Sequence, residues 1–351
     1  MPTQRSVLLF SQSSGDIIHT LALYEKFRNE KCPVSLFVIN LENSYQYYQS
    51  LDLELELFVF IPYTKYFLGL YKNPFAPLAE KIRLKLLFQR YFSRTQDAEV
   101  YYFSNLFDWV TAFFISTLSV RNRIHMVDYM DKNLHISPVT SISLKKKWQL
   151  FIYWFITGIK FTFGEMGHKN YQVFPSERFL VMKQNPAEPD KELLKKYHPD
   201  SGEIRNPSIL LFEYDASKDQ FFNKYEETLS KIIQVCVNAG YTIYLKPHPR
   251  LGASEFLHQL PVRFIPAIIP GELLDLEAFT FIFGIITNAI TSVSEEQYDS
   301  TYCLMNLFDL QEKVNRKLLE DSFLSKSNGK LKFLNTVLQL EEVLQSGLKK
   351  E

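Results

Sequence analysis

The chain has 351 residues, of which 46% are hydrophobic and 22% charged, so it has enough apolar material for two globular domains. Lys plus Arg equal Asp plus Glu at 39 each, which argues against a general nucleic-acid binder. Three widely separated cysteines, Cys32, Cys236 and Cys303, do not suit a disulfide framework or a zinc site and indicate a reducing compartment. We therefore expect a cytoplasmic protein.

The first elements are a strand at residues 6–10, a small polar loop at 11–16 and a helix at 17–29. This succession is the opening of a Rossmann-like unit. The loop lacks the spacing of a dinucleotide fingerprint and of a Walker loop. Its short side chains, Ser13 and Ser14 among them, would still let a ligand approach N–H groups at the helix start. A plain strand-to-helix turn explains the loop equally well.

Strands and helices continue to alternate through the first half of the chain. The expected strands cover 34–39, 57–61, 99–103 and 123–128, and the expected helices cover 76–94 and 109–119. This alternation predicts a mostly parallel sheet with helices on both faces.

A polar, proline-bearing stretch at about 184–208 separates this series from a second one,. The second series has expected strands at 208–212, 242–245, 262–265 and 279–283, a helix at 222–238 and an amphipathic helix at 331–348. Two Rossmann-like domains facing across a cleft are the arrangement of a GT-B glycosyltransferase. The predicted divisions are a first domain at 1–195, a linker at 196–207, a second domain at 208–332 and a C-terminal helix at 333–351.

The run Lys246-Pro247-His248-Pro249-Arg250 directly follows an apolar strand. Its two prolines restrict the backbone on both sides of His248 and exclude helix. Open α/β sheets bind ligands at the carboxyl ends of their strands, and two cations in the same turn suit a phosphate. The competing interpretation is a surface turn with a solvated histidine.

Two basic and aromatic stretches, 81–92 and 145–156, have the pattern of helices that lie on anionic lipid. Core helices whose lysine stems cover apolar surface explain each stretch as well. The sequence has no uninterrupted apolar run of about 18 residues, so we expect no transmembrane helix.

Three motifs in the second half occur in the order found in one family: Lys246–Pro249, the Ile-Pro-Gly-Glu-Leu-Leu run at 269–274, and the Phe-Gly-Ile-Ile-Thr-Asn-Ala run at 283–289. In these motifs the chain resembles bacterial sialyltransferases and polysialyltransferases, which are CMP-sialic-acid-dependent GT-B enzymes. The similarity is specific only between about 240 and 295.

The resemblance implies an inverting transfer of sialic acid, or a related nonulosonic acid, from its CMP-sugar to a hydroxyl of lipooligosaccharide or capsule. It implies that His248 assists departure of the CMP phosphate, with the CMP-sugar as substrate and no metal or other cofactor. Peripheral contact with the inner membrane would suit a glycan or glycolipid acceptor, and some relatives are homodimers. The residues expected on the donor side are Lys246, Pro249, Arg250, Glu272, Gly284, Thr287 and Asn288.

The chain departs from the family in its acidic motif. The family has two adjacent acids and a glycine, whereas this chain has only Asp128 and Asp131 around a strand end. Either carboxylate could deprotonate the acceptor. The departure also leaves open another donor, such as CMP-Kdo or a CDP-polyol, and a catalytically inactive GT-B scaffold.

Overall fold

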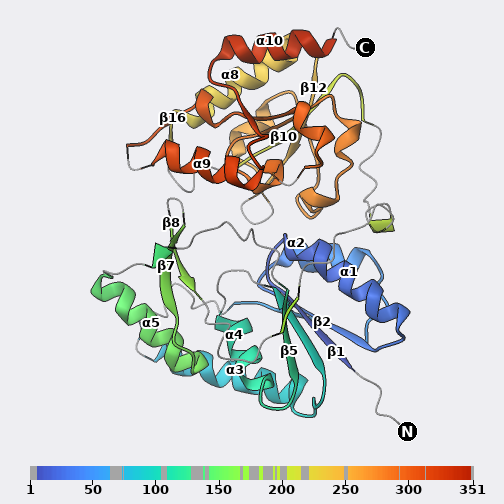
Figure 1. Cartoon of the computed structure of the whole chain (residues 1–351), viewed down its shortest axis with the longest axis vertical. Helices are drawn as coiled ribbons and strands as arrows, with labels where there is room; N and C mark the ends of the chain where they lie inside the picture. The colour runs from blue at the N-terminus through green and yellow to red at the C-terminus, as the bar shows by residue number, and fades with distance from the viewer. Residues whose placement is uncertain are drawn as a thin grey trace. The chain divides into compact units, whose positions relative to one another are not determined.

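The computed structural model describes residues 6–63, 73, 75–103, 109–127, 137–138, 142–166, 169–173, 182–184, 193, 196–197, 204–214, 221–248, 252–291, 293–312 and 314–348. The chain divides into two compact units, Met1–Leu193 and Leu194–Glu351. Each unit is built around its own parallel sheet (Figure 1).

The sheet of the first unit has six parallel strands in the order β3-β2-β1-β4-β5-β9. Its strands are β1 (Val7–Ser11), β2 (Val34–Ile39), β3 (Leu57–Ile61), β4 (Glu99–Phe103), β5 (Arg123–Val127) and β9 (Met182–Gln184). The chain first moves outward from β1 in one direction and then in the other. This is the doubly wound order, whose switch point lies between β1 and β4.

Helices cover both faces of this sheet, as predicted (Figure 1). They are α1 (Asp16–Asn29), α2 (Glu42–Ser50), α3 (Ala76–Phe92), α4 (Trp109–Leu118) and α5 (Leu144–Thr157). Phe27 of α1 packs on Tyr101 with ring centroids 5.2 Å apart, whereas Phe10 packs on Phe92 of α3 and Phe114 of α4. Phe10 is in register with the residue after Tyr101, and neighbouring strand residues point to opposite faces.

The first unit also contains a small antiparallel sheet, with strand order β6-β7-β8, that the sequence analysis does not anticipate. Its strands are β6 (Ser137–Pro138), β7 (Thr162–Met166) and β8 (Lys169–Val173).

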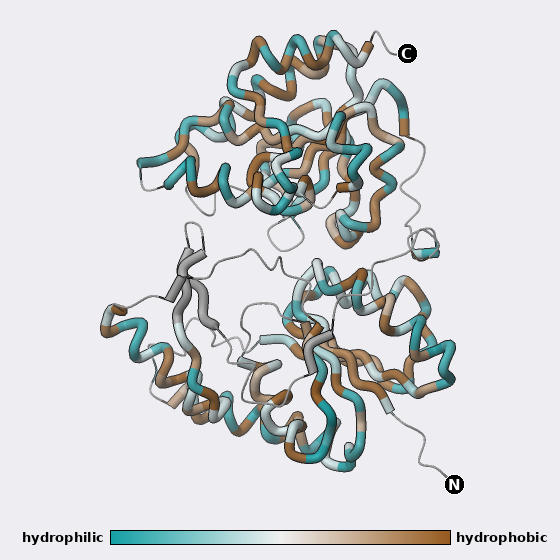
Figure 2. The backbone as a smooth tube through the Cα atoms, viewed as in Figure 1, coloured by the Kyte–Doolittle hydropathy of each residue, from teal (hydrophilic) through white to brown (hydrophobic). Residues whose placement is uncertain are grey.

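The second unit repeats the doubly wound order with six parallel strands, β13-β12-β10-β14-β15-β17. They are β10 (Ser208–Phe212), β12 (Thr242–Lys246), β13 (Val262–Phe264), β14 (Phe281–Gly284), β15 (Thr301–Cys303) and β17 (Lys332–Phe333). A two-stranded ribbon joins β11 (Phe222–Asn223) to β16 (Asp309–Leu310). The apolar colouring of the central strands of the two parallel sheets in Figure 2 agrees with their burial, which is expected where helices cover a parallel sheet.

The helices of the second unit are α8 (Tyr225–Asn238), α9 (Arg316–Lys326) and α10 (Val337–Leu348). Short 3-10 helices follow several strands: η3 (Glu255–Gln259), η4 (Gly271–Leu273), η5 (Leu276–Ala278), η6 (Asn288–Thr291), η7 (Glu296–Asp299) and η8 (Met305–Leu307). None of the described helices is long and apolar enough to cross a bilayer.

The C-terminal helix starts later than predicted. Residues 332–333 form β17, which pairs with Tyr302 and Cys303. The helix begins only at Val337, because Thr336 Oγ1 accepts from the Gln339 N–H and Gln339 Oε1 accepts from the Asn335 N–H. Reciprocal bonds of this kind fix a helix start, so the prediction of helix from 331 was wrong at this end.

Candidate functional site

Three central strands of the second unit end level with one another. Phe212, the last residue of β10, is in register with Lys246 of β12 and Gly284 of β14. The strand order reverses at β10: the strands that follow it in the chain, β12 and β13, lie on one side of it, and the later strands, β14, β15 and β17, lie on the other. Crevices at such switch points bind ligands in open α/β sheets. Two of the three motifs predicted to bind the donor begin in the last residues of β12 and β14, and the third passes the end of β10 at Gly271.

Lys246 is buried at this edge, with only 3% of the residue exposed. Its ammonium donates to the carbonyl oxygens of Pro247 at 3.0 Å and Ala267 at 3.4 Å. Burial lowers the pKa of Lys246 to about 8, although the negative charge of Glu272 opposes this shift,. The side chain therefore ties the end of β12 to the segment that leads to Glu272.

The segment with Glu272 passes very close to the end of β10. A Cβ placed on Gly271 would lie 2.9 Å from Phe212 Cε1, so only glycine allows η4 this approach without a shift of the ring. Glu272 itself is exposed. Nucleotide binding by Glu272 stays a prediction.

A tight turn follows β14. A Cβ on Gly284 would lie 2.7 Å from Ile290 Cγ2 and 2.8 Å from Thr287 Cγ2, so glycine lets η6 fold back over the strand end. Thr287 Oγ1 accepts from the Ala289 N–H at 3.3 Å. Gly284 thus has a packing role, and its neighbours provide the polar groups.

The structure adds one cation that the sequence analysis missed. Lys326, at the end of α9, donates from Nζ to Asn288 Oδ1 at 2.7 Å. The two residues are separated by 38 positions, so no local pattern pairs them. The contact places a lysine ammonium beside Asn288, at the turn that follows β14.

Two contacts restrain His248, one to its backbone and one to its side chain. The Gly252 N–H donates to the His248 carbonyl at 2.9 Å, and Gly252 has a φ of +77°, which favours glycine. The Tyr214 ring meets the imidazole edge to face, with centroids 6.1 Å apart. Pro249 and Arg250 lie outside the described residues.

Glu213 also stabilises the chain that follows His248, through hydrogen bonds to Ser254. Its buried carboxylate accepts from the Ser254 hydroxyl at 2.5 Å and from the Ser254 N–H at 3.3 Å. This links the chain after β10 to the chain after His248. The sequence marks Glu213 only as an acid after a strand, so its partner could not be predicted.

In the first unit, the N–H groups of the loop after β1 are hydrogen-bonded to the carboxylate of Asp16. Asp16 is fully buried and accepts from the Gln12 and Ser13 N–H groups at 2.7 and 2.8 Å and from the Ser13 hydroxyl at 3.0 Å. These N–H groups are already satisfied, while Ser14 is half-buried. Substrate binding by Ser13 and Ser14 stays a prediction.

The predicted base residues, Asp128 and Asp131, lie outside the described residues. The strand before them is observed, since β5 ends at Val127 beside β4.

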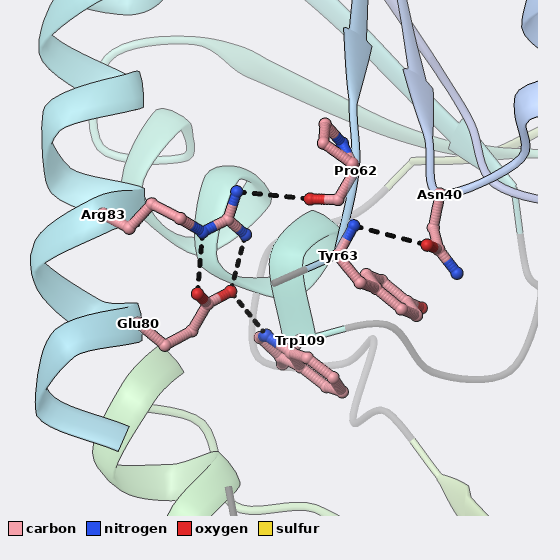
Figure 3. A network of polar contacts seen from close by, with 6 residues as sticks. All are labelled: Asn40, Pro62, Tyr63, Glu80, Arg83 and Trp109. Carbon is pink, nitrogen blue, oxygen red and sulfur yellow. Dashed lines mark hydrogen bonds and ion pairs between the residues drawn. The ribbon is translucent and has the colours of Figure 1, made fainter. Parts of the chain in front are cut away.

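A polar network around the buried Glu80 and Trp109 lies near the ends of β2 and β3 (Figure 3). Glu80 receives two hydrogen bonds from Arg83, at 2.6 and 2.7 Å, and one from Trp109 Nε1 at 3.2 Å. Arg83 also donates to the Pro62 carbonyl at 3.2 Å, and the Tyr63 ring stacks on Trp109. The network fixes α3 against α4, and its carboxylate is fully engaged.

No group of three or more His, Cys, Asp or Glu side chains suited to a metal ion occurs in the described ranges. No protein-family model matches the chain, and no curated protein matches its sequence.

Solved structures do match it. The glycotransferase of kitacinnamycin has a TM-score of 0.53 and 11% identity, over 99% of this chain and 91% of its own. The UDP-GlcNAc 2-epimerase of Methanocaldococcus jannaschii has a TM-score of 0.50 and 10% identity, over 98% and 92%.

Two doubly wound units, matched along nearly the whole chain by these proteins, define the GT-B-like fold that the sequence predicted. Identities this low show the fold alone, because one fold supports many chemistries.

Proposed function

We propose that the chain is an inverting glycosyltransferase that moves a sialic acid or related nonulosonic acid from its CMP-sugar to a hydroxyl of a bacterial surface glycan. The observation that carries this proposal is the convergence of three motif segments on the ends of β10, β12 and β14. They bring His248, Glu272 and the Thr287-Asn288 pair to one switch point, together with Lys326.

Charge on the leaving phosphate is the main demand of this chemistry. The anomeric carbon is tertiary and carries a carboxylate, so the transition state resembles an oxocarbenium ion while CMP departs. Preorganised donors stabilise such developing charge best. In the proposal, the His248 imidazole donates to the phosphate, Thr287 and Lys326 contribute further polar contacts, and Glu272 accepts from the ribose or cytosine.

Lys246 has a different part in this scheme. Its ammonium is buried and donates to the carbonyls of Pro247 and Ala267, so we assign it to positioning the turn and the segment before Glu272. Pro249 and Arg250 are proposed for the donor site on the sequence motif alone. The scheme asks for no metal, because His248 and the cationic corner at Lys326 supply the charge compensation.

The acceptor hydroxyl needs a base, and Asp128 or Asp131 is proposed for this task. The incomplete acidic motif around them also favours a second candidate, a GT-B scaffold that binds a nucleotide without turnover. A transferase with another donor, such as CMP-Kdo or a CDP-polyol, would use the same phosphate contacts.

Release of CMP from a panel of CMP-sugars tests the proposal. The panel contains CMP-Neu5Ac, CMP-Kdo and the CMP forms of pseudaminic and legionaminic acid, with a CDP-polyol beside them. We expect turnover of one CMP-sugar and a fall in kcat of about 10²- to 10⁴-fold in His248→Ala, as for other general acids. The exposed His258, which stacks on Phe264, provides the control variant His258→Ala.

Asp128→Asn and Asp131→Asn, assayed with an acceptor, distinguish the two bases. Binding of a CMP-sugar without any turnover would support the scaffold. Absence of both binding and turnover across the panel would refute the nonulosonic-acid transferase.

A further inference from the structure

Helix α5 presents a stripe of aromatic rings to solvent. Trp148, Phe151 and Trp154 are 46%, 47% and 45% exposed. The rings follow one another along the helix, with centroids 5.3 and 5.7 Å apart. The opposite side of the helix, at Ile152 and Ile156, is buried in the core. Contiguous exposed apolar surface of this kind marks an interaction site.

The positive charges on α5 lie at the end of the helix where they destabilise it. Lys145, Lys146 and Lys147 occupy the first turn, after the Ser143 cap, and the helix contains no Asp or Glu. Cations at a helix N-terminus oppose the helix dipole. Local rules are broken in this way mainly where function requires it, and three lysines indicate an anionic partner.

Helix α3 lies beside α5 and also carries basic and exposed apolar side chains. Lys81 Nζ donates to the Phe155 carbonyl at 2.6 Å and lies 4.6 Å from the Phe155 ring centroid. Leu78, Ile82 and Leu86 are all about half exposed or more and recur every four residues.

The one acid of α3, Glu80, is buried and bound to Arg83 and Trp109 (Figure 3). The two neighbouring helices therefore combine exposed apolar and basic groups without an exposed carboxylate.

We propose that α5, with the adjoining stripe of α3, docks on the surface of a bilayer that contains anionic lipid. Tryptophan has an apolar body and an N–H donor and favours the boundary between hydrocarbon and water. Lysines next to it pair with lipid phosphates. A second copy of the chain is a poor occupant, because it would bring two sets of lysines face to face. This proposal does not depend on the proposed function.

Vesicle co-sedimentation of the full chain tests it, with phosphatidylglycerol-containing and pure phosphatidylcholine vesicles at two salt concentrations. We expect binding to the anionic vesicles that salt weakens. Lys145→Gln, Lys146→Gln and Lys147→Gln together should lower partitioning on the order of a hundredfold, at about fivefold per lysine. The control carries the same charge change at the exposed Lys26, Lys231 and Lys317 and should keep most of the binding.

A second variant replaces the aromatic stripe, as Trp148→Ser, Phe151→Ser and Trp154→Ser. Its control, Val337→Ser with Leu338→Ser, removes exposed apolar groups from α10. We expect loss of vesicle binding only in the α5 variant, with circular dichroism showing a retained fold. The exposed lysine variant carries the test if the aromatic variant does not fold.

Three results would overturn the proposal. The first is equal binding of wild type and the lysine variant to anionic vesicles, and the second is equal binding of wild type to both vesicle types. The third is a wild-type dimer in sedimentation velocity that the aromatic substitutions convert to monomer while vesicle binding is unchanged, which would make α5 a contact between copies.

Discussion

Because of Lys246, we expect the free energy of unfolding of the second unit to change with pH in the alkaline range. Burial lowers the pKa of Lys246 from 10.5 to about 8, because an ammonium loses hydration at the end of β12. Between these two values the unfolded chain holds a proton that the folded chain has lost. The free energy of unfolding contributed by Lys246 therefore rises as the pH rises through this window, and it is lower below pH 8.

The size of the effect follows from the two pKa values. A difference this large corresponds to about 3 kcal/mol over the whole window, and most of it falls between pH 7 and pH 10. Lys246→Met removes the titrating group and keeps an unbranched chain of similar size. Urea unfolding of wild type and variant at pH 7, 8, 9 and 10 gives the difference in free energy of unfolding, in which other titrating groups cancel.

We expect the difference in free energy of unfolding to move in favour of the wild type by about 2–3 kcal/mol from pH 7 to pH 10. Lys231→Met, whose lysine side chain is 71% exposed, reports any general effect of losing a lysine. A difference that stays constant across the pH range would show that Lys246 is not a buried ammonium. The assignment of Lys246 to positioning would then be wrong.

Three further substitutions test the frame of the site. Glu213→Gln replaces a charged acceptor of the Ser254 bonds, and we expect a loss of about 1–3 kcal/mol in free energy of unfolding by urea denaturation. Gly284→Ala places a methyl group against Ile290, and a loss of about 1–3 kcal/mol, seen as a lower Tm, is expected; an unchanged Tm would contradict the packing role. Lys326→Gln should weaken nucleotide binding about tenfold in calorimetry without changing Tm, and unchanged affinity would remove this residue from the site.

Much of the fold could be predicted because buried parallel strands leave a plain signal. β1, β2, β4 and β10 are buried along their whole length, so each is an apolar run between polar loops. The place of the His-Pro turn followed from the strand before it. The two residues of β17 carry too little pattern to be separated from the helix that follows them.

The contacts that define the site depend on tertiary structure. Lys326 meets Asn288, and Glu213 meets Ser254 across 41 positions, so neither pair leaves a local signal. In the sequence, Asp16 looks like an ordinary first-turn acid favoured by the helix dipole. In the structure, its carboxylate accepts hydrogen bonds from the same loop whose N–H groups were predicted to bind a ligand. Sequence reasoning located the strand ends correctly and could not say which polar groups were already bound.

Nucleotide recognition by the second unit is the central claim of the proposed function. Calorimetric titration of the full chain with CMP, UDP and ADP, each against wild type and Glu272→Gln, measures this without any acceptor. We expect CMP to bind at least about tenfold more tightly than UDP or ADP, a difference of about 1.4 kcal/mol, and we expect Glu272→Gln to reduce this preference. Tighter binding of UDP or ADP, or no binding of CMP, would contradict this central claim.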